Sequence, residues 1–288
     1  TIGEASFGDE KLEGDGAAQG CTSLFYPGCS FTNFAPELLI PLYRMLKDRG
    51  QVDGVSFICC GKILKFEPDA KTVKPAFQEQ LADVIVARGI ERMVVACPNC
   101  IAELRAMREK YENLAGLEIA LLPEVLLECG IAVSHDDIRT LLQKDERLKD
   151  EEVPKLSIHD SCPDRRTGEL ARSTRKLFPP EVLHEMEHNY ARSICCGALA
   201  NAAGRPDVAK KQAISRGEEA RAAHATSIVT YCMSCAHMLG HNDIGMPVHH
   251  YLEFVTGIHV DWASKPEYMA YRLLFEELQG KRNFLGVG

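Results

Sequence analysis

The 288-residue sequence lacks the features that mark a membrane or exported protein. No apolar run approaches the roughly 18 residues that are needed to cross a bilayer. The first residues do not form a basic segment followed by an apolar stretch, as a secretory signal would. We therefore expect a soluble, cytoplasmic protein without a membrane span.

A surplus of positive charge is also missing. Lysine and arginine total 33 against 41 aspartates and glutamates, which gives a net charge of -8. Nucleic acids and anionic membranes attract basic surfaces, so this balance argues against both as general partners. A protein or a small molecule is the expected partner.

Cysteine, by contrast, is abundant, with 12 residues. A chain of this size does not need disulfide bonds to fold, and its cysteines occur in Cys-Cys and Cys-x-x-Cys groups. This clustering favours thiolate ligands for a metal over disulfides.

Short apolar runs rich in β-formers alternate with helical patterns from Cys21 onward. In the first half we predict strands at Ser23–Tyr26, Val55–Ile58 and Met93–Ala96, and helices at about Phe34–Arg49 and Lys71–Arg88. In the second half we predict strands at Leu156–His159 and Ser227–Tyr231, and a helix at Asp207–Ala223. This alternation is typical of βαβ units, so the fold class is α/β with parallel sheets.

The two halves carry cysteines at matching places. The first half has Cys29, then Cys59-Cys60-Gly61, then Cys97-Pro98-Asn99-Cys100. The second half has Cys162, then Cys195-Cys196-Gly197, then Cys232-Met233-Ser234-Cys235. Corresponding cysteines are 133, 136 and 135 residues apart, and a helix ending in Gly-Ile follows in each half. We infer an internal duplication and predict two homologous Rossmann-like domains related by a pseudo-twofold axis.

This duplication divides the chain into four segments. Residues 1–20 hold five glycines and five acids without apolar periodicity and are predicted to be a flexible arm. The first cysteine-rich domain is placed at 21–150 and the second at 151–262, with the charged stretch Gln143–Lys155 as the linker. Residues 263–288 are predicted to form an amphipathic C-terminal helix that packs on its own domain or docks a partner.

Each cysteine group directly follows a predicted strand. The carboxyl ends of parallel strands line one crevice, so five cysteines are expected to converge in each domain. A structural zinc ion takes four ligands, and so does a cubane iron–sulfur cluster. Cys59 and Cys60 are adjacent and should point to opposite sides, which suits different irons of a larger, opened cluster, with Gly61 allowing close backbone approach. An unusual iron–sulfur cluster is therefore favoured over a zinc ion with a spare thiol and over a thioredoxin-type dithiol.

The pattern Cys…Cys-Cys-Gly…Cys-x-x-Cys, present twice, resembles the twin cysteine-rich (CCG) domains found in heterodisulfide reductase and its relatives. The resemblance runs from Tyr26-Pro27-Gly28-Cys29 to Tyr231-Cys232-Met233-Ser234-Cys235 and covers about residues 21–260. It implies two noncubane [4Fe-4S] clusters, with a substrate disulfide cleaved between them. The implied ligands are Cys29, Cys59, Cys60, Cys97 and Cys100 for one cluster, and Cys162, Cys195, Cys196, Cys232 and Cys235 for the other.

Two departures from the family pattern leave these ligands in place but indicate a different substrate pocket. The 29 residues between Cys29 and Cys59 are slightly fewer than usual, and Ser161-Cys162-Pro163-Asp164 stands where relatives often have Pro-Cys-His. Cys21 and Cys129 have no counterpart in the other half and are expected to be ordinary buried residues.

The chain also lacks two motifs through which electrons are commonly received. It has neither the closely spaced cysteine run of a bacterial ferredoxin nor the Gly-x-Gly-x-x-Gly fingerprint of a dinucleotide site. A partner must therefore deliver the electrons. The resemblance implies a ferredoxin-like iron–sulfur subunit and a flavoprotein subunit as partners.

Polar residues beside the cysteines are candidates for proton donors or for binding an anionic substrate group. His159, Arg165 and Lys62 are the predicted catalytic residues, and Asp160 and Arg166 share the stretch around Cys162. The alternative for each is a solvated or paired charge. Four histidines follow the last cysteine, and structural roles are the alternative to ligand or acid roles for them: His237, His241, His249 and His250.

Two functional hypotheses follow. The first is a catalytic subunit of a heterodisulfide-reductase-like complex, which reduces a disulfide or oxidises thiols in reverse. The alternative is an electron-relay subunit of a lactate, glycolate or glycerol-3-phosphate dehydrogenase system. Two complete five-cysteine motifs favour the first hypothesis, because a relay has no need of a second unusual cluster.

Overall fold

A computed structural model describes residues 21–149 and 154–265 of the chain. The predicted N-terminal arm and all but the first three residues of the predicted C-terminal segment lie outside the described residues. Among the helices of the described part, none is both long enough and apolar enough to cross a membrane.

The first domain is built on a parallel sheet with the strand order β2-β1-β3-β4. Its strands are β1 (Ser23–Tyr26), β2 (Gly54–Val55), β3 (Arg92–Val95) and β4 (Glu118–Leu121). Its helices are α1 (Cys29–Phe34), α2 (Pro36–Asp48), α3 (Ala70–Ala87), α4 (Pro98–Lys110), α5 (Leu122–Glu128) and α6 (His135–Leu142), with short 3-10 turns at η1 (Lys62–Phe66) and η2 (Glu112–Leu114). The strand centres are buried, as in the Val94-Val95 pair of β3, because helices cover both faces of a parallel sheet.

The second domain repeats this plan with the strand order β5-β6-β7, again parallel. Its strands are β5 (Leu156–His159), β6 (Ser227–Thr230) and β7 (Val248–His250). Its helices are α7 (Glu169–Lys176), α8 (Ala198–Ala202), α9 (Pro206–Ala222), α10 (Met233–His241) and α11 (Tyr251–Thr256), with 3-10 turns at η3 (Cys162–Asp164), η4 (Pro180–Val182) and η5 (Tyr190–Arg192). A single parallel bridge between Leu156 and Leu183 occupies the place that β2 has in the first domain. The predicted fold class, two α/β domains with parallel sheets, is therefore confirmed.

Two predicted elements differ from the structure in an informative way. The predicted helix at Phe34–Arg49 is two helices, because α1 ends at Phe34 and α2 begins at Pro36, a residue suited to the first turn of a helix. The predicted strand at Val55–Ile58 shrinks to Gly54–Val55. The backbone leaves the sheet after Val55, so Cys59 and Cys60 do not directly follow the end of a strand.

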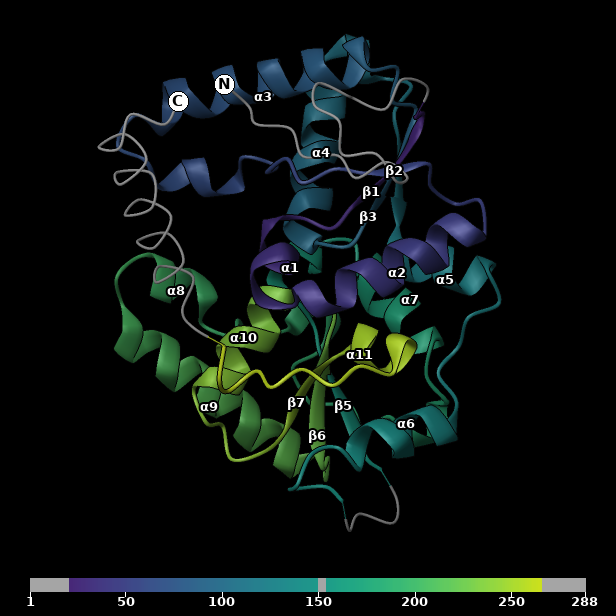
Figure 1. Cartoon of the computed structure of the whole chain (residues 1–288). Coiled ribbons are helices and arrows are strands. Elements are labelled where there is room, and N and C mark those ends of the chain that lie inside the picture. The colour runs from purple at the N-terminus through teal and green to yellow at the C-terminus, as the bar shows by residue number, and fades with distance from the viewer. Residues whose placement is uncertain (1–20, 150–153, 266–288) are drawn as a thin grey trace, which may run out of the picture.

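The contacts between the two domains are reciprocal (Figure 1). When an element of the first domain contacts an element of the second, the equivalent elements of the two repeats also contact each other, with the domains reversed. Helix α1, which starts at the first cysteine of domain one, contacts α10, which holds the Cys-x-x-Cys of domain two. Reciprocally, α4 with the first Cys-x-x-Cys contacts η3, which starts at Cys162. In the same reciprocal way, α2 contacts α11 and α5 contacts α7. A contact pattern of this kind is the signature of a twofold, here a pseudo-twofold between repeats.

Candidate metal centre

The cysteines lie at the carboxyl ends of the strands in both domains. Cys29 is the first residue of α1 after β1, Cys97 is the N-cap of α4 after β3, and Cys100 lies in the first turn of α4. In the second domain Cys162 begins η3 after β5, and Cys232 is the N-cap of α10 after β6. The strands therefore bring together five residues that are far apart in sequence, as the duplicated motif predicts.

The first cysteine site consists of Cys29, Cys59, Cys60, Cys97 and Cys100. Cys60 and Cys100 are buried and the other three are partly exposed. Hydrogen bonds from Cys29 and Cys60, together with the Gly61 N–H at 3.4 Å, lower the pKa of Cys59 to about 3 although burial opposes this. The pKa of Cys29 is raised, first because of its hydrogen bond to Cys59 and then because of burial. One thiol of the group is thus favoured as a thiolate, the form that binds metal.

The second cysteine site, made of Cys162, Cys195, Cys196, Cys232 and Cys235, repeats this arrangement. The Cys196 and Cys235 sulfurs are 3.2 Å apart, and the Gly197 N–H lies 3.4 Å from the Cys195 sulfur. Hydrogen bonds from Cys162 and Cys196 lower the pKa of Cys195 to about 2. Cys59 and Cys195 are therefore equivalent thiolates in the two repeats.

The adjacent cysteines of each pair contact different neighbours. Cys59 interacts with Cys29 and with Cys60, and Cys60 in turn interacts with Cys100. The prediction that adjacent thiols point to opposite sides is wrong, because the two thiols of each pair interact with each other. Their other cysteine partners differ. Each pair links the strand-end cysteine to the Cys-x-x-Cys helix, so that all five thiols form one connected group.

Two glycines allow this close packing. Gly28 has a φ of +83°, and a Cβ there would lie 2.9 Å from the Cys100 sulfur and 3.0 Å from the Cys97 Cβ. Gly197 has a φ of +99°, and a Cβ there would lie 2.5 Å from the backbone oxygen of Ala209. Both positions combine a left-handed backbone with a lack of space, so glycine is required there.

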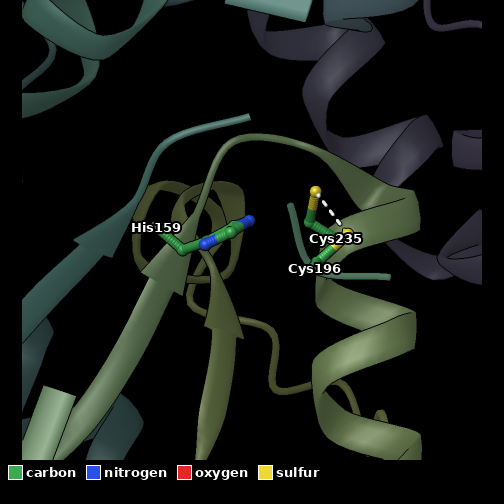
Figure 2. Close-up of side chains that lie close together, drawn as sticks. All are labelled: His159, Cys196 and Cys235. Atoms are coloured by element: carbon green, nitrogen blue, oxygen red, sulfur yellow. Dashed lines mark hydrogen bonds between the residues drawn. The ribbon is translucent and has the colours of Figure 1, made fainter. Parts of the chain in front are cut away.

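Buried polar groups at both sites fit a cofactor that accepts hydrogen bonds. The Tyr26 hydroxyl and both ring nitrogens of His159 are buried and meet no hydrogen-bond partner among the described residues. The Tyr26 side chain interacts with four cysteines of the first site, and the His159 ring lies within 4.8 Å of the sulfurs of Cys196 and Cys235 (Figure 2). Buried donors are normally satisfied, so two orphan groups beside ten thiols fit sulfur-rich clusters better than bare thiols.

The two cysteine sites lie against each other across the domain interface. Ser30, next to Cys29, and Ser234, inside the second Cys-x-x-Cys, are hydrogen-bonded at 2.9 Å. The Phe34 and His237 rings stack beside them, with centroids 4.2 Å apart. Lys65 of η1 belongs to the first domain but interacts electrostatically with Cys162 of the second. Residues that adjoin the two cysteine sites therefore meet at the domain interface.

The predicted catalytic residues take up different positions around this centre. His159 is fully buried, and burial, followed by the nearby Arg216, lowers its pKa to about 3. Arg165 is exposed and donates to the Ser193 carbonyl, while Lys62 is paired with Glu103 at 2.7 Å. Their catalytic roles stay predictions. Of the flanking charges, Asp160 is held by the buried Arg175 at 2.8 Å.

Sequence reasoning missed Tyr26 and Lys65. Tyr26 could have been found from the repeat, because Tyr26 and His159 each precede the first cysteine of their half by three residues. Lys65 carries no such signal, since its neighbour Cys162 belongs to the other domain. Cys21 lies near Asp53 and Lys47 at the amino end of β1, and Cys129 follows α5, so both are outside the two sites.

The fold and site define a twin-domain α/β protein with one five-thiol centre per domain. The cysteine-rich domain family (CCG) matches the chain twice, over residues 23–105 and 156–240, which is more than half of its length. The chain therefore belongs to this family. Membership indicates an iron–sulfur-binding subunit of the oxidoreductase type.

Other comparisons are more distant. No curated protein sequence matches the chain. Among solved structures it is similar to the glutamate racemase isoform RacE1 from Bacillus anthracis, with 11% identity, a TM-score of 0.35, and 81% of this chain and 77% of that chain covered. An aspartate racemase from Picrophilus torridus shows 9% identity and a TM-score of 0.34, with 88% of this chain and 98% of that chain covered. Likenesses this weak carry no argument about function.

Proposed function

We propose that the chain is the catalytic subunit of a heterodisulfide-reductase-like complex. In this proposal each cysteine site holds one noncubane [4Fe-4S] cluster, and a disulfide is reduced, or thiols are oxidised in reverse, between the two. The observation that carries the proposal is the Ser30–Ser234 hydrogen bond, which joins residues adjacent to ligands of both sites. Two cysteine sites that adjoin the same domain interface suit one substrate with two sulfurs.

Reducing a disulfide consumes two electrons and two protons and yields two thiols. When bound, the clusters supply the electrons, which in this proposal reach them from a ferredoxin-like subunit and a flavoprotein subunit. The chain itself must stabilise the thiolates that form and deliver protons to them. Lys65 is a candidate for both tasks, because it belongs to the first domain yet interacts electrostatically with Cys162 of the second, and burial lowers its pKa.

The three predicted catalytic residues have three different surroundings, which bear on their roles under this mechanism. Lys62 is paired with Glu103, and Glu103 also pairs with Lys74 at 2.7 Å, so Lys62 shares its single counter-charge with a second lysine. Arg165 is exposed and can bind an anionic group of the substrate. His159 is buried behind Cys196 and Cys235 and so acts on the centre and not on the substrate.

Anaerobic metal analysis tests the cofactor. We expect about eight irons and a similar amount of acid-labile sulfide per chain, with broad visible absorbance that oxygen bleaches. The reconstituted complex should then reduce a disulfide, and thiol treatment should produce an EPR signal. Two zinc ions without labile sulfide would overturn the cofactor, whereas iron-loaded protein that passes electrons without disulfide turnover would favour the relay function.

A further inference from the structure

The second domain contains three ligand-type side chains that the proposed function does not use. His249 lies in β7, Glu253 in α11, and His259 follows α11 in sequence. One ligand atom from each lies within 4.8 Å of the others. His249 and Glu253 are fully buried, and the His259 side chain is 25% exposed.

The Glu253 carboxylate lies in a buried interior and is surrounded by N–H donors. Its oxygens accept the backbone N–H of His250 at 2.6 Å and of Val260 at 2.9 Å, and the Trp262 indole N–H at 2.6 Å. Three N–H donors directed at one carboxyl group favour its ionised form. No lysine or arginine among the described residues forms an ion pair with it, so a bound cation or a histidine proton must balance it.

The two histidines approach the same carboxylate oxygen. The Nδ1 atoms of His249 and His259 lie 3.5 and 3.3 Å from Oε2 of Glu253. Neither Nδ1 atom forms a well-aligned hydrogen bond in the described structure. Ligands bound at about 2.0 to 2.2 Å around a tetrahedral zinc ion are separated by about this distance.

An access route exists on one side of the group. His259 lines a cavity of about 280 Å³, together with Val260 and Trp262. Asp145 also lines this cavity, but its carboxylate is held by Arg147 at 2.7 Å. A fourth coordination position facing the cavity would therefore be open to water or a small ligand.

We propose that His249, Glu253 and His259 form a second kind of metal site, which binds one Zn²⁺ with its fourth position open to the cavity. Two histidines and one carboxylate with an exchangeable position are a set that zinc accepts. The ion would tie β7, α11 and the segment after α11 together. Because α11 packs on α2 and α6 of the first domain, the ion would also stabilise the domain interface.

The test uses anaerobically purified, iron-loaded full-length protein dialysed against ZnCl₂ and then buffer. We expect about one zinc per chain, with a first shell of nitrogen and oxygen near 2.0 Å and no sulfur near 2.3 Å in Zn K-edge absorption spectra. His259→Gln should lose this zinc and keep its iron. His259→Asp, which retains a ligand oxygen, should recover part of it, and the exposed control His224→Gln should retain all of it.

Three results would overturn this site. The first is sulfur among the atoms that coordinate the zinc ion. The second is a zinc content of His259→Gln that equals that of the wild type, and the third is a wild type that binds no zinc. Iron content is measured in the same samples, so a failure of the zinc site is separate from a failure of the iron–sulfur proposal.

A different observation carries a second inference, which rests on the proposed clusters. Tyr26 ends β1 and His159 ends β5, at equivalent positions of the repeat. Both are buried beside the cysteines, and their polar atoms have no hydrogen-bond partner among the described residues. We infer that each donates a hydrogen bond to a sulfur of the cluster in its own domain. Hydrogen bonds to sulfur set the potential of such clusters, so a phenol in one domain and an imidazole in the other would give the two clusters different potentials.

Redox titration followed by EPR tests this pair. Tyr26→Phe should shift the midpoint potential of one cluster to a more negative value, and His159→Leu should do so for the other, with iron content unchanged. Tyr251→Phe is the matched control, because the buried Tyr251 hydroxyl also has no hydrogen-bond partner among the described residues, yet burial alone accounts for its raised pKa. Unchanged midpoint potentials in both variants, with full iron content, would overturn the inferred hydrogen bonds but not the proposed clusters. A wild type that binds no iron would overturn the hydrogen bonds and the clusters together.

Discussion

Cys60→Ser or Cys196→Ser alone is expected to abolish disulfide turnover in the reconstituted complex. Each substitution removes a buried thiol that links the Cys-Cys pair to the Cys-x-x-Cys helix, in the first and second site respectively. In the proposed mechanism a substrate held between the two sites needs both, and the cofactor left in the other domain cannot replace the missing one. Iron should fall by about four per chain in each single variant.

The double variant distinguishes this mechanism from a relay. Groups that act as one unit are strongly non-additive, so Cys60→Ser combined with Cys196→Ser should reduce turnover no further than either alone. Cys129→Ser, outside both sites, is the control and should keep its iron and turnover. Substantial disulfide turnover in either single variant with one intact cluster would argue for the relay function.

Gly197→Ala is expected to lower stability strongly and to empty the second cysteine site. The added methyl group would lie 2.5 Å from the Ala209 carbonyl oxygen in α9, at a φ of +99°. Backbone strain and overpacking each cost about 1 to 3 kcal/mol, so a loss on the order of 4 kcal/mol is expected. This corresponds to a thermal midpoint lowered by about 10 °C in a chain of this size.

Gly204→Ala provides the matched control for this effect. Gly204 also has a positive φ, +72°, but a Cβ there meets nothing within 4 Å. The free energy of unfolding of this variant should therefore fall only by the cost of an alanine in the left-handed conformation, about 1 to 2 kcal/mol. Its iron content should be unchanged. Equal midpoints for the two variants would show that the close approach of Gly197 to α9 is unimportant. Thermal unfolding and iron analysis of the same samples measure both effects.

Much of the site was readable from local patterns. Strands alternate with helices along the chain, and cysteines directly follow β1 and β3, so parallel pairing brings Cys29 and Cys97 to one edge of the sheet. The near-constant spacing between repeats then predicts the second site from the first. Residues within one domain could be assigned in this way because their positions depend on strand ends, which the sequence marks clearly.

Local boundaries were less predictable. The apolar run Val55–Ile58 satisfies a strand pattern, yet only Val55 of it pairs in the sheet. The rest of the run turns away toward the cysteine site, and Phe57 and Ile58 pack against the hydrophobic core there without strand pairing. A tertiary contact of this kind overrides local β-propensity, and its partner lies outside any sequence window.

The sequence by itself determined the α/β class, the duplication, and the ten thiols that form two five-cysteine groups, because each depends on short-range pattern or on a repeated spacing. Only the tertiary structure decided how the domains meet, which places Ser30 against Ser234 and Lys65 near Cys162. It also decided that His159 lies buried behind Cys196 and Cys235, and that His249, Glu253 and His259 converge. These relations join residues whose proximity follows from packing of whole elements, and no spacing along the chain encodes that packing.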